Sequence, residues 1–283
     1  MATTFTNKAT LTINGITAVS NTVTGEIADN LTVTKATLTD GYTTGTEKTF
    51  LITMTNTGET PLTGLTVSDD LGGYAFGEQT LTPLTYTGGS ALYFINGTQQ
   101  GSVSVTAGPP LVFTGISVPA GGISTLIYNA AANEYAPLGA GASVNNTATV
   151  TGAALTAPAT ATAEVNADTA PELTLKKNLY PLTVAVGGTL TYTFTIENGG
   201  GAAEATDAIV LSDVFDPALT GITVTLDGAA LAGTDYSYSA ETGTFTVNPG
   251  TITVPAATYT QDPVTGVWSA VPGTAVLTVS GTV

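Results

Sequence analysis

The sequence predicts an all-β protein in which two tandem β-sandwich domains follow an N-terminal arm. Threonine and valine dominate many segments, and these residues favour strands. Short runs of alternating apolar and polar residues recur between turns rich in Gly, Pro and Asn, a spacing typical of sandwiches. No segment shows a convincing helical period, so the prediction contains no helix.

An internal repeat organises the chain. Thr6–Thr12 is echoed by Asn145–Thr151, and Leu31–Lys35 is echoed by Leu173–Lys177. A match that recurs after about 140 residues indicates repeated domains. In mid-chain the echo follows a run of strands and closes a domain, whereas no domain precedes its N-terminal copy. We therefore expect the N-terminal copy to complete a domain elsewhere.

Residues 1–30 are the predicted donor-strand arm. Its first strand alternates apolar residues with Thr and Lys, as a strand with one apolar face does. The residues of this face are Phe5, Asn7, Ala9 and Leu11. Asn14-Gly15 is a two-residue hairpin signal, and Val19–Ile27 supplies the second strand.

Residues 31–155 are predicted as the first sandwich, because short strands alternate there with turn signals such as Asp40-Gly41 and Asn96-Gly97. The predicted strands are Leu31–Thr37, Lys48–Asn56, Leu65–Asp69, Ala91–Asn96, Ser102–Ala107, Val112–Val118, Ser124–Ala130 and Val144–Thr151.

Residues 156–172 are predicted as a connector and residues 173–283 as the second sandwich. The second copy repeats the first in order, with an extra hairpin expected around Pro263–Gly266. Its matching segments are Leu173–Lys177, Leu190–Gly199, Ile209–Asp213, Ile252–Ala256 and Gly273–Val279. No later segment matches Val144–Thr151, so we expect the second sandwich to lack its closing strand.

Composition excludes several classes of function. The 283 residues are 42% hydrophobic and only 9% charged, which allows a sizeable core under a mostly neutral surface. The net charge of −16 and the absence of Arg make nucleic acid and anionic membranes poor partners. Without Cys or His there are no disulfides, thiol nucleophiles, usual zinc sites or His-based triads. We therefore expect neither an enzyme nor a cofactor or metal.

The N-terminus, Met1–Phe5, shows no basic and apolar leader pattern. No stretch approaches the roughly 18 apolar residues of a membrane span. We expect either a mature chain or a protein that leaves the cell by another route, such as lysis.

Several of these segments together resemble the DUF11-type immunoglobulin-like repeats of bacterial and archaeal surface proteins, over about residues 31–283 as two copies. The segments that carry the resemblance are Lys177, Leu190–Gly199, Val210–Asp213, Val254–Ala256 and Asn146–Thr151. The resemblance implies Ig-like sandwiches in a non-enzymatic protein, extracellular or at a cell or spore surface. Such modules occur in stalks, surface layers, adhesins and appendages. This chain departs from the pattern in its displaced closing strand.

A sandwich that lacks a strand exposes unpaired backbone groups and an apolar slot, which invite strand addition. We predict that the arm enters the second sandwich of the next identical subunit, and that this head-to-tail contact builds a homopolymeric filament. Three residues separate Ile27 from Leu31, a reach of about 10 Å, so closure within one chain looks blocked unless the domains fold back. The alternatives are a disordered tail, a monomeric stalk or adhesion module that binds carbohydrate or a surface protein, and a glycosidase-associated binding module.

The resemblance also implies a chemistry, because related surface domains carry Lys–Asn isopeptide bonds. Such a bond needs a first-strand Lys, a last-strand Asn and a buried carboxylate that moves protons in a dry core. The matching residues in the first sandwich are Lys35, Asp69 and Asn146. Those in the second are Lys177, Asp213 and the neighbouring subunit's Asn7. The alternative is that the lysines are surface residues, the asparagines cap turns, and the aspartates bind backbone N–H groups.

Overall fold

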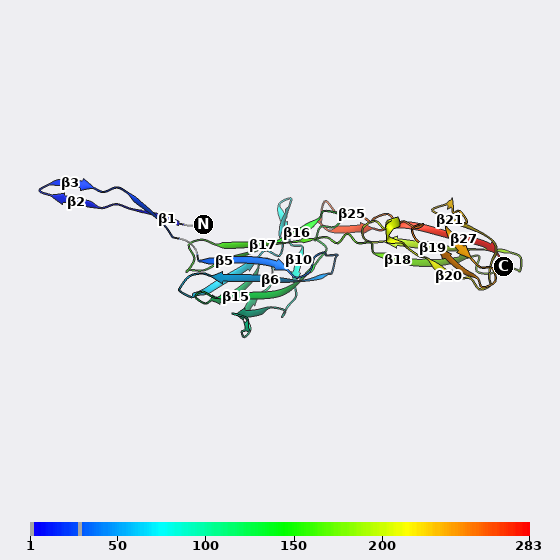
Figure 1. Ribbon diagram of the computed structural model, residues 1–283, viewed down its shortest axis with the longest axis horizontal. Helices are drawn as coiled ribbons and strands as arrows, with labels where there is room; N and C mark the ends of the chain where they lie inside the picture. Colours follow the sequence, from blue (N-terminus) through cyan, green and yellow to red (C-terminus); the bar gives the residue numbers. More distant parts are fainter. Residues whose placement is uncertain (1–2, 28–29) are drawn as a thin grey trace. The chain divides into compact units, whose positions relative to one another are not determined.

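The computed structural model describes residues 3–27 and 30–283 (Figure 1). Within these residues every regular element is a β-strand except one 3-10 turn, η1 at Ala205–Asp207. The prediction of an all-β chain is therefore confirmed. The chain divides into two compact units, one comprising Met1–Ala136 with Ser143–Asn166 and the other Pro137–Ala142 with Ala167–Val283.

The N-terminal residues form a β-hairpin in two parts. Its pairs are antiparallel: β1 (Thr3–Asn7) with β4 (Val23–Ile27), and β2 (Thr10–Ile13) with β3 (Ile16–Val19). Asn14 and Gly15 turn the chain with φ angles of 51° and 79°, the left-handed conformation that a two-residue hairpin turn requires. The predicted turn is confirmed, whereas each of the two predicted strands is divided in the structure, at residues 8–9 and at residues 20–22.

The first unit also contains a sandwich of two antiparallel sheets (Figure 1). One sheet has the order β12-β11-β15-β6-β5, and β10 also pairs with β15. Its strands are β5 (Leu31–Thr37), β6 (Glu47–Asn56), β10 (Leu84–Tyr86), β11 (Leu92–Ile95), β12 (Thr98–Gln99) and β15 (Ile123–Ala132). The other sheet has the order β13-β14-β7-β16-β17. Its strands are β7 (Leu62–Asp69), β13 (Ser104–Thr106), β14 (Leu111–Val118), β16 (Ser143–Thr151) and β17 (Ala159–Asn166). A separate hairpin joins β8 (Tyr74–Phe76) to β9 (Gln79–Leu81).

Period-2 alternation buries one face of each sheet of the first sandwich. On β6, Phe50 and Ile52 are completely buried while Leu51 between them is partly exposed. The Phe50 ring stacks on Tyr128 of β15 with centroids 5.4 Å apart, and Phe113 of the opposite sheet lies 5.6 Å from the same tyrosine. An aromatic cluster thus joins the two sheets at the centre of this sandwich.

One strand lies where the sequence predicted a connector. β17 pairs with β16 from Ser143↔Asn166 to Val150↔Ala159, and both strands contact β5. Its buried residues include Ala163, and small alanines provide too little hydrophobic contrast for a strand to be predicted from period alone. The connector is therefore shorter than the predicted residues 156–172, and β16 and β17 form a hairpin over the edge of the sandwich.

The second unit contains a sheet of order β18-β19-β27-β21-β22 and a smaller sheet of order β20-β24-β23. The strands of the larger sheet are β18 (Leu173–Tyr180), β19 (Thr189–Asn198), β21 (Thr220–Leu226), β22 (Ala229–Ala230) and β27 (Gly273–Thr282). The strands of the smaller sheet are β20 (Ser212–Val214), β23 (Tyr236–Tyr238) and β24 (Thr244–Val247). The extra hairpin expected around Pro263–Gly266 is confirmed, between β25 (Thr258–Gln261) and β26 (Trp268–Val271).

Two predicted strands of the second sandwich are wrong in extent. Only Ser212 and Asp213 of the predicted Ile209–Asp213 lie in a strand, and Ile252–Ala256 contributes a single bridge from Val254 to Ala203. In the first sandwich the matching strand β7 lies between β14 and β16, whereas β20 pairs with β24 alone among the described residues. A strand with one neighbour makes fewer ladder hydrogen bonds, which accounts for the shorter β20.

Candidate functional site

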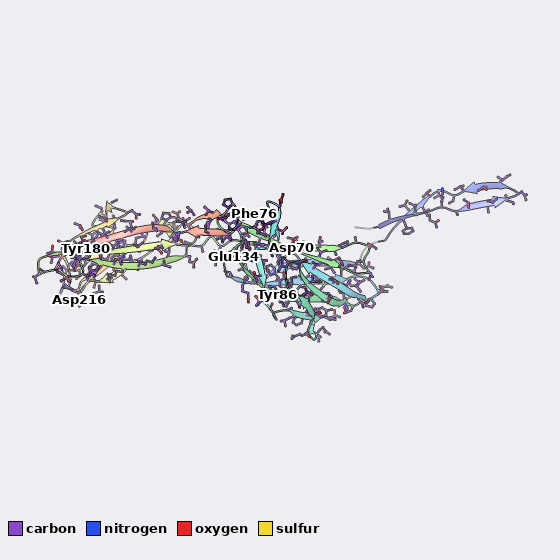
Figure 2. All side chains as sticks on the ribbon, turned by 180° about the vertical axis from the view of Figure 1, so that it is seen from behind. Asp70, Phe76, Tyr86, Glu134, Tyr180 and Asp216 are labelled. Atoms are coloured by element: carbon purple, nitrogen blue, oxygen red, sulfur yellow. The ribbon has the colours of Figure 1, made fainter. Side chains whose placement is uncertain are left out.

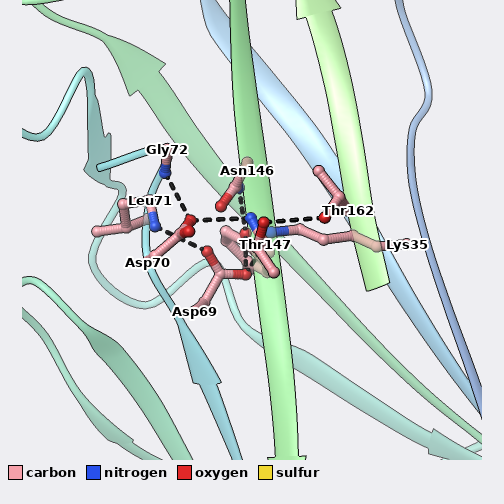
Figure 3. A network of polar contacts seen from close by, with 9 residues as sticks. Lys35, Asp69, Asp70, Leu71, Gly72, Asn146, Thr147 and Thr162 are labelled. Carbon is pink, nitrogen blue, oxygen red and sulfur yellow. Dashed lines mark hydrogen bonds and ion pairs between the residues drawn. The ribbon is translucent and has the colours of Figure 1, made fainter. Parts of the chain in front are cut away.

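A buried polar cluster lies at the centre of the first sandwich (Figure 3). It brings together the three residues that the sequence predicted, from three strands: Lys35 of β5, Asp69 at the end of β7, and Asn146 of β16. Lys35 Nζ lies 2.7 Å from Asp69 Oδ2, and both side chains are completely buried. Burial of charged groups costs free energy even when they are paired, so this buried pair is a candidate for a chemical role.

A fourth residue, Tyr128, completes the cluster and was not among the predicted residues. Its hydroxyl donates to Asp69 Oδ2 over 2.6 Å and accepts from Asn146 Nδ2 over 2.9 Å. One carboxylate oxygen therefore connects the lysine amine, through the tyrosine, to the amide nitrogen of asparagine. The available sequence signal was an inward-facing tyrosine in the apolar run of β15, since a buried phenol usually needs a polar partner.

Burial changes the proton affinities in this cluster. It lowers the pKa of Lys35 from the ordinary 10.5, because desolvation disfavours the ammonium more than the Asp69 charge favours it. Burial, reinforced by the charge of Asp69, raises the pKa of Tyr128 well above 10.0. The lysine is thus biased toward the neutral amine, which is a nucleophile, while the tyrosine keeps its proton.

Backbone hydrogen bonds hold the acidic residues in place. Asp69 Oδ1 accepts from the Leu71 N–H over 3.0 Å, which leaves Oδ2 to face the lysine and the tyrosine. The neighbouring Asp70 accepts from the N–H groups of Gly72 and Thr147, and so ties β7 to the strand that carries the asparagine. By contrast, Asn146 Oδ1 is buried and has no hydrogen-bond partner among the described residues.

The predicted site of the second sandwich contains the lysine and the carboxylate. Lys177 of β18 contacts Asp213 of β20, but their side chains are 41% and 19% exposed. Among the residues described, no asparagine side chain is hydrogen-bonded to this pair. The third predicted member, Asn7, lies on β1 of the N-terminal hairpin, where its side chain is exposed.

An apolar groove of about 290 Å³ runs beside this pair, between β18 and the residues that lead into β20. The residues that line it are Leu173, Thr174, Leu175, Ile196, Ile209, Val210, Leu211 and Ser212. β18 is the edge strand of its sheet and ends at the exposed Tyr180 (Figure 2). Leu173 is 39% exposed and Leu175 is 57% exposed. Leu31, the counterpart of Leu173 in the first sandwich, is only 7% exposed.

The difference has a visible cause. In the first sandwich, β16 pairs with β7 and β17 packs against β5, so the hairpin of these two strands covers the corresponding position. No described strand covers it in the second sandwich. Equivalent sequences are therefore buried in one copy and open in the other.

The N-terminal hairpin has the opposite property, because it exposes an apolar face. The cross-strand pairs Leu11↔Ala18 and Ile13↔Ile16 place apolar residues on one side of β2 and β3, and Phe5 lies opposite Gly25 in the pair of β1 and β4. Leu11 is 70% exposed and Ile16 is 72% exposed, although the β16 residues that the echo matches to this face are fully buried. A lone two-stranded hairpin is at best marginally stable in water, so this face calls for a partner.

The residues described by the structure contain no group of three or more acidic side chains placed to bind a metal ion. In the same residues no helix is long and apolar enough to cross a membrane.

No protein-family model matches the chain, and no curated protein matches it in sequence. The resemblance to DUF11-type repeats therefore stays a prediction.

Solved structures show weak likenesses. The major pilin subunit BcpA of Bacillus cereus has a TM-score of 0.36 at 11% identity, over 95% of this chain and 73% of that chain. A 35 kDa C-terminal fragment of the major pilin of Streptococcus agalactiae has a TM-score of 0.36 at 14% identity, over 87% and 91%. For the pilus backbone protein RrgB of Streptococcus pneumoniae the values are 0.34 and 11%, over 85% of this chain and 54% of that chain. Likenesses this weak do not show a function for this chain.

Proposed function

We propose that the protein is the structural subunit of an extracellular, homopolymeric filament, in which the N-terminal hairpin of one subunit fills the groove of the second sandwich of the next. The observation that supports this most strongly is that one chain exposes both an open apolar groove and an apolar hairpin face. The open groove beside β18 matches a position that β16 and β17 cover in the first sandwich, and the exposed hairpin repeats the sequence of β16.

The internal repeat also sets a register for the contact. β16 pairs with β7 so that Ala148 lies opposite Asp69 and Val150 opposite Val67. Transferred through the echo, this register puts Ala9 opposite Asp213 and Leu11 opposite Leu211 of the neighbour. Phe5, Asn7, Ala9 and Leu11 then point into the neighbour's core, as Val144, Asn146, Ala148 and Val150 do in the first sandwich.

The free energy of such docking has two sources. Each large apolar side chain that becomes buried, such as Leu175 or Leu11, contributes about 1.5–3 kcal/mol before ordering costs are subtracted. Strand addition also pairs the backbone groups along the free edge of β20. Both terms are available to a donated β-hairpin, because its strands are already formed.

The contact joins two different surfaces, so it propagates head to tail and builds an open filament or a ring. The hairpin is joined to β5 through three residues, whose reach is about 10 Å, which favours a groove on another molecule over the chain's own.

Within each first sandwich we propose that the buried cluster forms an amide bond between Lys35 Nζ and Asn146 Cγ. The neutral amine attacks the carboxamide carbon, and its proton passes to Asp69 Oδ2. The tyrosine hydroxyl, which already bonds to the amide nitrogen, protonates that group as it leaves and recovers a proton from the aspartic acid. The C–N bond to ammonia breaks as the new C–N bond forms, so the chain loses one ammonia.

Electron microscopy tests assembly. The full-length chain is expected to form filaments, and a chain that lacks residues 1–27 is expected to give discrete particles. Leu175→Asp places a charge in the groove and should also stop assembly, while Val264→Asp, a matched change on an exposed loop far along the chain, should not. Discrete particles from the full-length chain would overturn the proposal and favour a monomeric surface stalk or adhesion module.

A further inference from the structure

We propose that assembly is followed by a covalent weld between subunits, an amide bond from Lys177 Nζ to Asn7 Cγ of the docked hairpin. The inference rests on the proposed hairpin donation and goes beyond it, since docking by itself is noncovalent. It names a modification site that is divided between two molecules: the second sandwich contributes the amine and the carboxylate, and the neighbour contributes the carboxamide.

The position of the asparagine follows from the repeat. Asn7 occupies the place in the hairpin that Asn146 occupies in β16, two residues before the alanine that faces the aspartate. In the first sandwich this asparagine reaches the buried cluster and bonds to Tyr128. The same register in the second sandwich brings Asn7 to Lys177 and Asp213.

The lysine is already aimed at the core. Lys177 Nζ contacts Asp213 and lies 4.7 Å from the centroid of the Tyr192 ring and 5.8 Å from that of Phe215. What the second sandwich lacks is the cover that excludes water, because both partners of the ion pair are partly exposed. A docked hairpin would exclude that water and leave the pair in a dry core, as β16 and β17 do for Lys35 and Asp69.

The bond balances without any further reagent. Neutral Lys177 Nζ attacks Asn7 Cγ, the bond from Cγ to Nδ2 breaks, and ammonia leaves. Asp213 takes the proton from the attacking amine and delivers it to the leaving nitrogen. The donor strand thereby becomes bonded to the subunit that receives it.

Besides this difference in cover, the two sites differ in one side chain, which predicts their order of reaction. In the first sandwich Tyr128 of β15 lies opposite Phe50 of β6, whereas in the second the corresponding pair is Val279 of β27 and Tyr192 of β19. The described residues of the second sandwich therefore place no tyrosine at the position of Tyr128. We expect the weld to form more slowly than the internal bond, after the hairpin has docked.

The experiment uses filaments of the full-length chain, collected by centrifugation and boiled in SDS. A ladder of covalent oligomers is expected, together with a branched peptide that links Lys177 to Asn7 and lacks one ammonia. Asn7→Ala and Lys177→Arg remove the carboxamide and the nucleophilic amine, and pellets of either should release only monomers. The matched control is Lys176→Arg, because this adjacent lysine faces solvent and pairs with Glu197; its ladder should persist.

The outcomes separate the two proposals. Wild-type filaments that dissolve to monomers in SDS, with no branched peptide, would overturn the weld and leave hairpin donation standing. A full-length chain that forms no filaments would overturn both. A ladder that survives Asn7→Ala and Lys177→Arg would also overturn this assignment, because some other bond would then hold the subunits.

Discussion

Lys35 and Tyr128 bond to the same carboxylate oxygen, Asp69 Oδ2, at 2.7 Å and 2.6 Å. The tyrosine hydroxyl in turn accepts from Asn146 Nδ2, so a continuous path connects an amine to an amide nitrogen inside the core. A carboxylate that only neutralised the lysine would not need this second connection. The geometry leads to predictions that separate a reactive cluster from a structural ion pair.

Tyr128→Phe should slow the formation of the Lys35–Asn146 bond, because it removes the group that protonates the leaving nitrogen. The ring and its packing against Phe50 remain. Intact mass measured during pulsed expression should show a larger fraction of chains that still retain the ammonia. Tyr93→Phe is the control, since the Tyr93 hydroxyl bonds to the Ser117 backbone and has no bond to the cluster. Equal rates in both variants would contradict the relay.

Asn146→Ala should lower the stability of the first sandwich. A covalent bond between residues 35 and 146 closes a loop of about 110 residues. Loop closure lowers the entropy of the unfolded chain and so raises the free energy of unfolding by about 4–5 kcal/mol. Thermal or denaturant unfolding of the first sandwich should therefore show a clear loss relative to the wild type. Asn133→Ala removes an asparagine that bonds to Thr82 outside the cluster, and should cost less. A wild type with no loss of ammonia and no advantage in stability would mean that the bond does not form.

The internal bond should form faster as pH rises. The neutral amine is the reactive form, and burial places the pKa of Lys35 below 10.5. Between that lowered pKa and 10.5 the unfolded chain binds more protons than the folded one, so the unbonded fold also becomes more stable with rising pH. Chains recovered unfolded and then refolded across a pH series should lose ammonia at rates that climb and level off below pH 10.5. A rate independent of pH would argue that the lysine amine is not the titrating group.

Ala9→Asp should block filament formation, because its counterpart Ala148 is fully buried and a carboxylate placed there would face Asp213 of the neighbour. Thr6→Asp adds the same charge on the opposite side of the strand, where the counterpart Asn145 is exposed, and should leave assembly intact. Both variants are compared by electron microscopy and light scattering. Filaments of normal length from Ala9→Asp would contradict the register proposed for the hairpin.

The sequence alone was enough to predict most strands and three members of the cluster. Alternation in Lys48–Asn56 and Val144–Thr151 is strong, and the structure has β6 and β16 there. Lys35, Asp69 and Asn146 were predicted because the resemblance to surface domains with Lys–Asn bonds implies a lysine on the first strand, a buried carboxylate and an asparagine on the last strand. β17 was missed because its alanines lack hydrophobic contrast, and β20 is shorter than predicted because it has one neighbour.

The sequence by itself determined the all-β character, the internal repeat and the polar residues within that repeat. Strand period and turn chemistry depend on a few neighbouring residues, so they can be recognised without the fold. Only the tertiary structure decided which of these polar side chains are buried away from water. Lys35 and Lys177 lie in near-identical strands, yet one is completely buried and the other is not, because a hairpin more than 100 residues away along the chain covers the first. Tyr128 joined the cluster for the same reason: its hydroxyl gains a role only when two sheets pack face to face and bring a carboxylate and an amide within 3 Å of it.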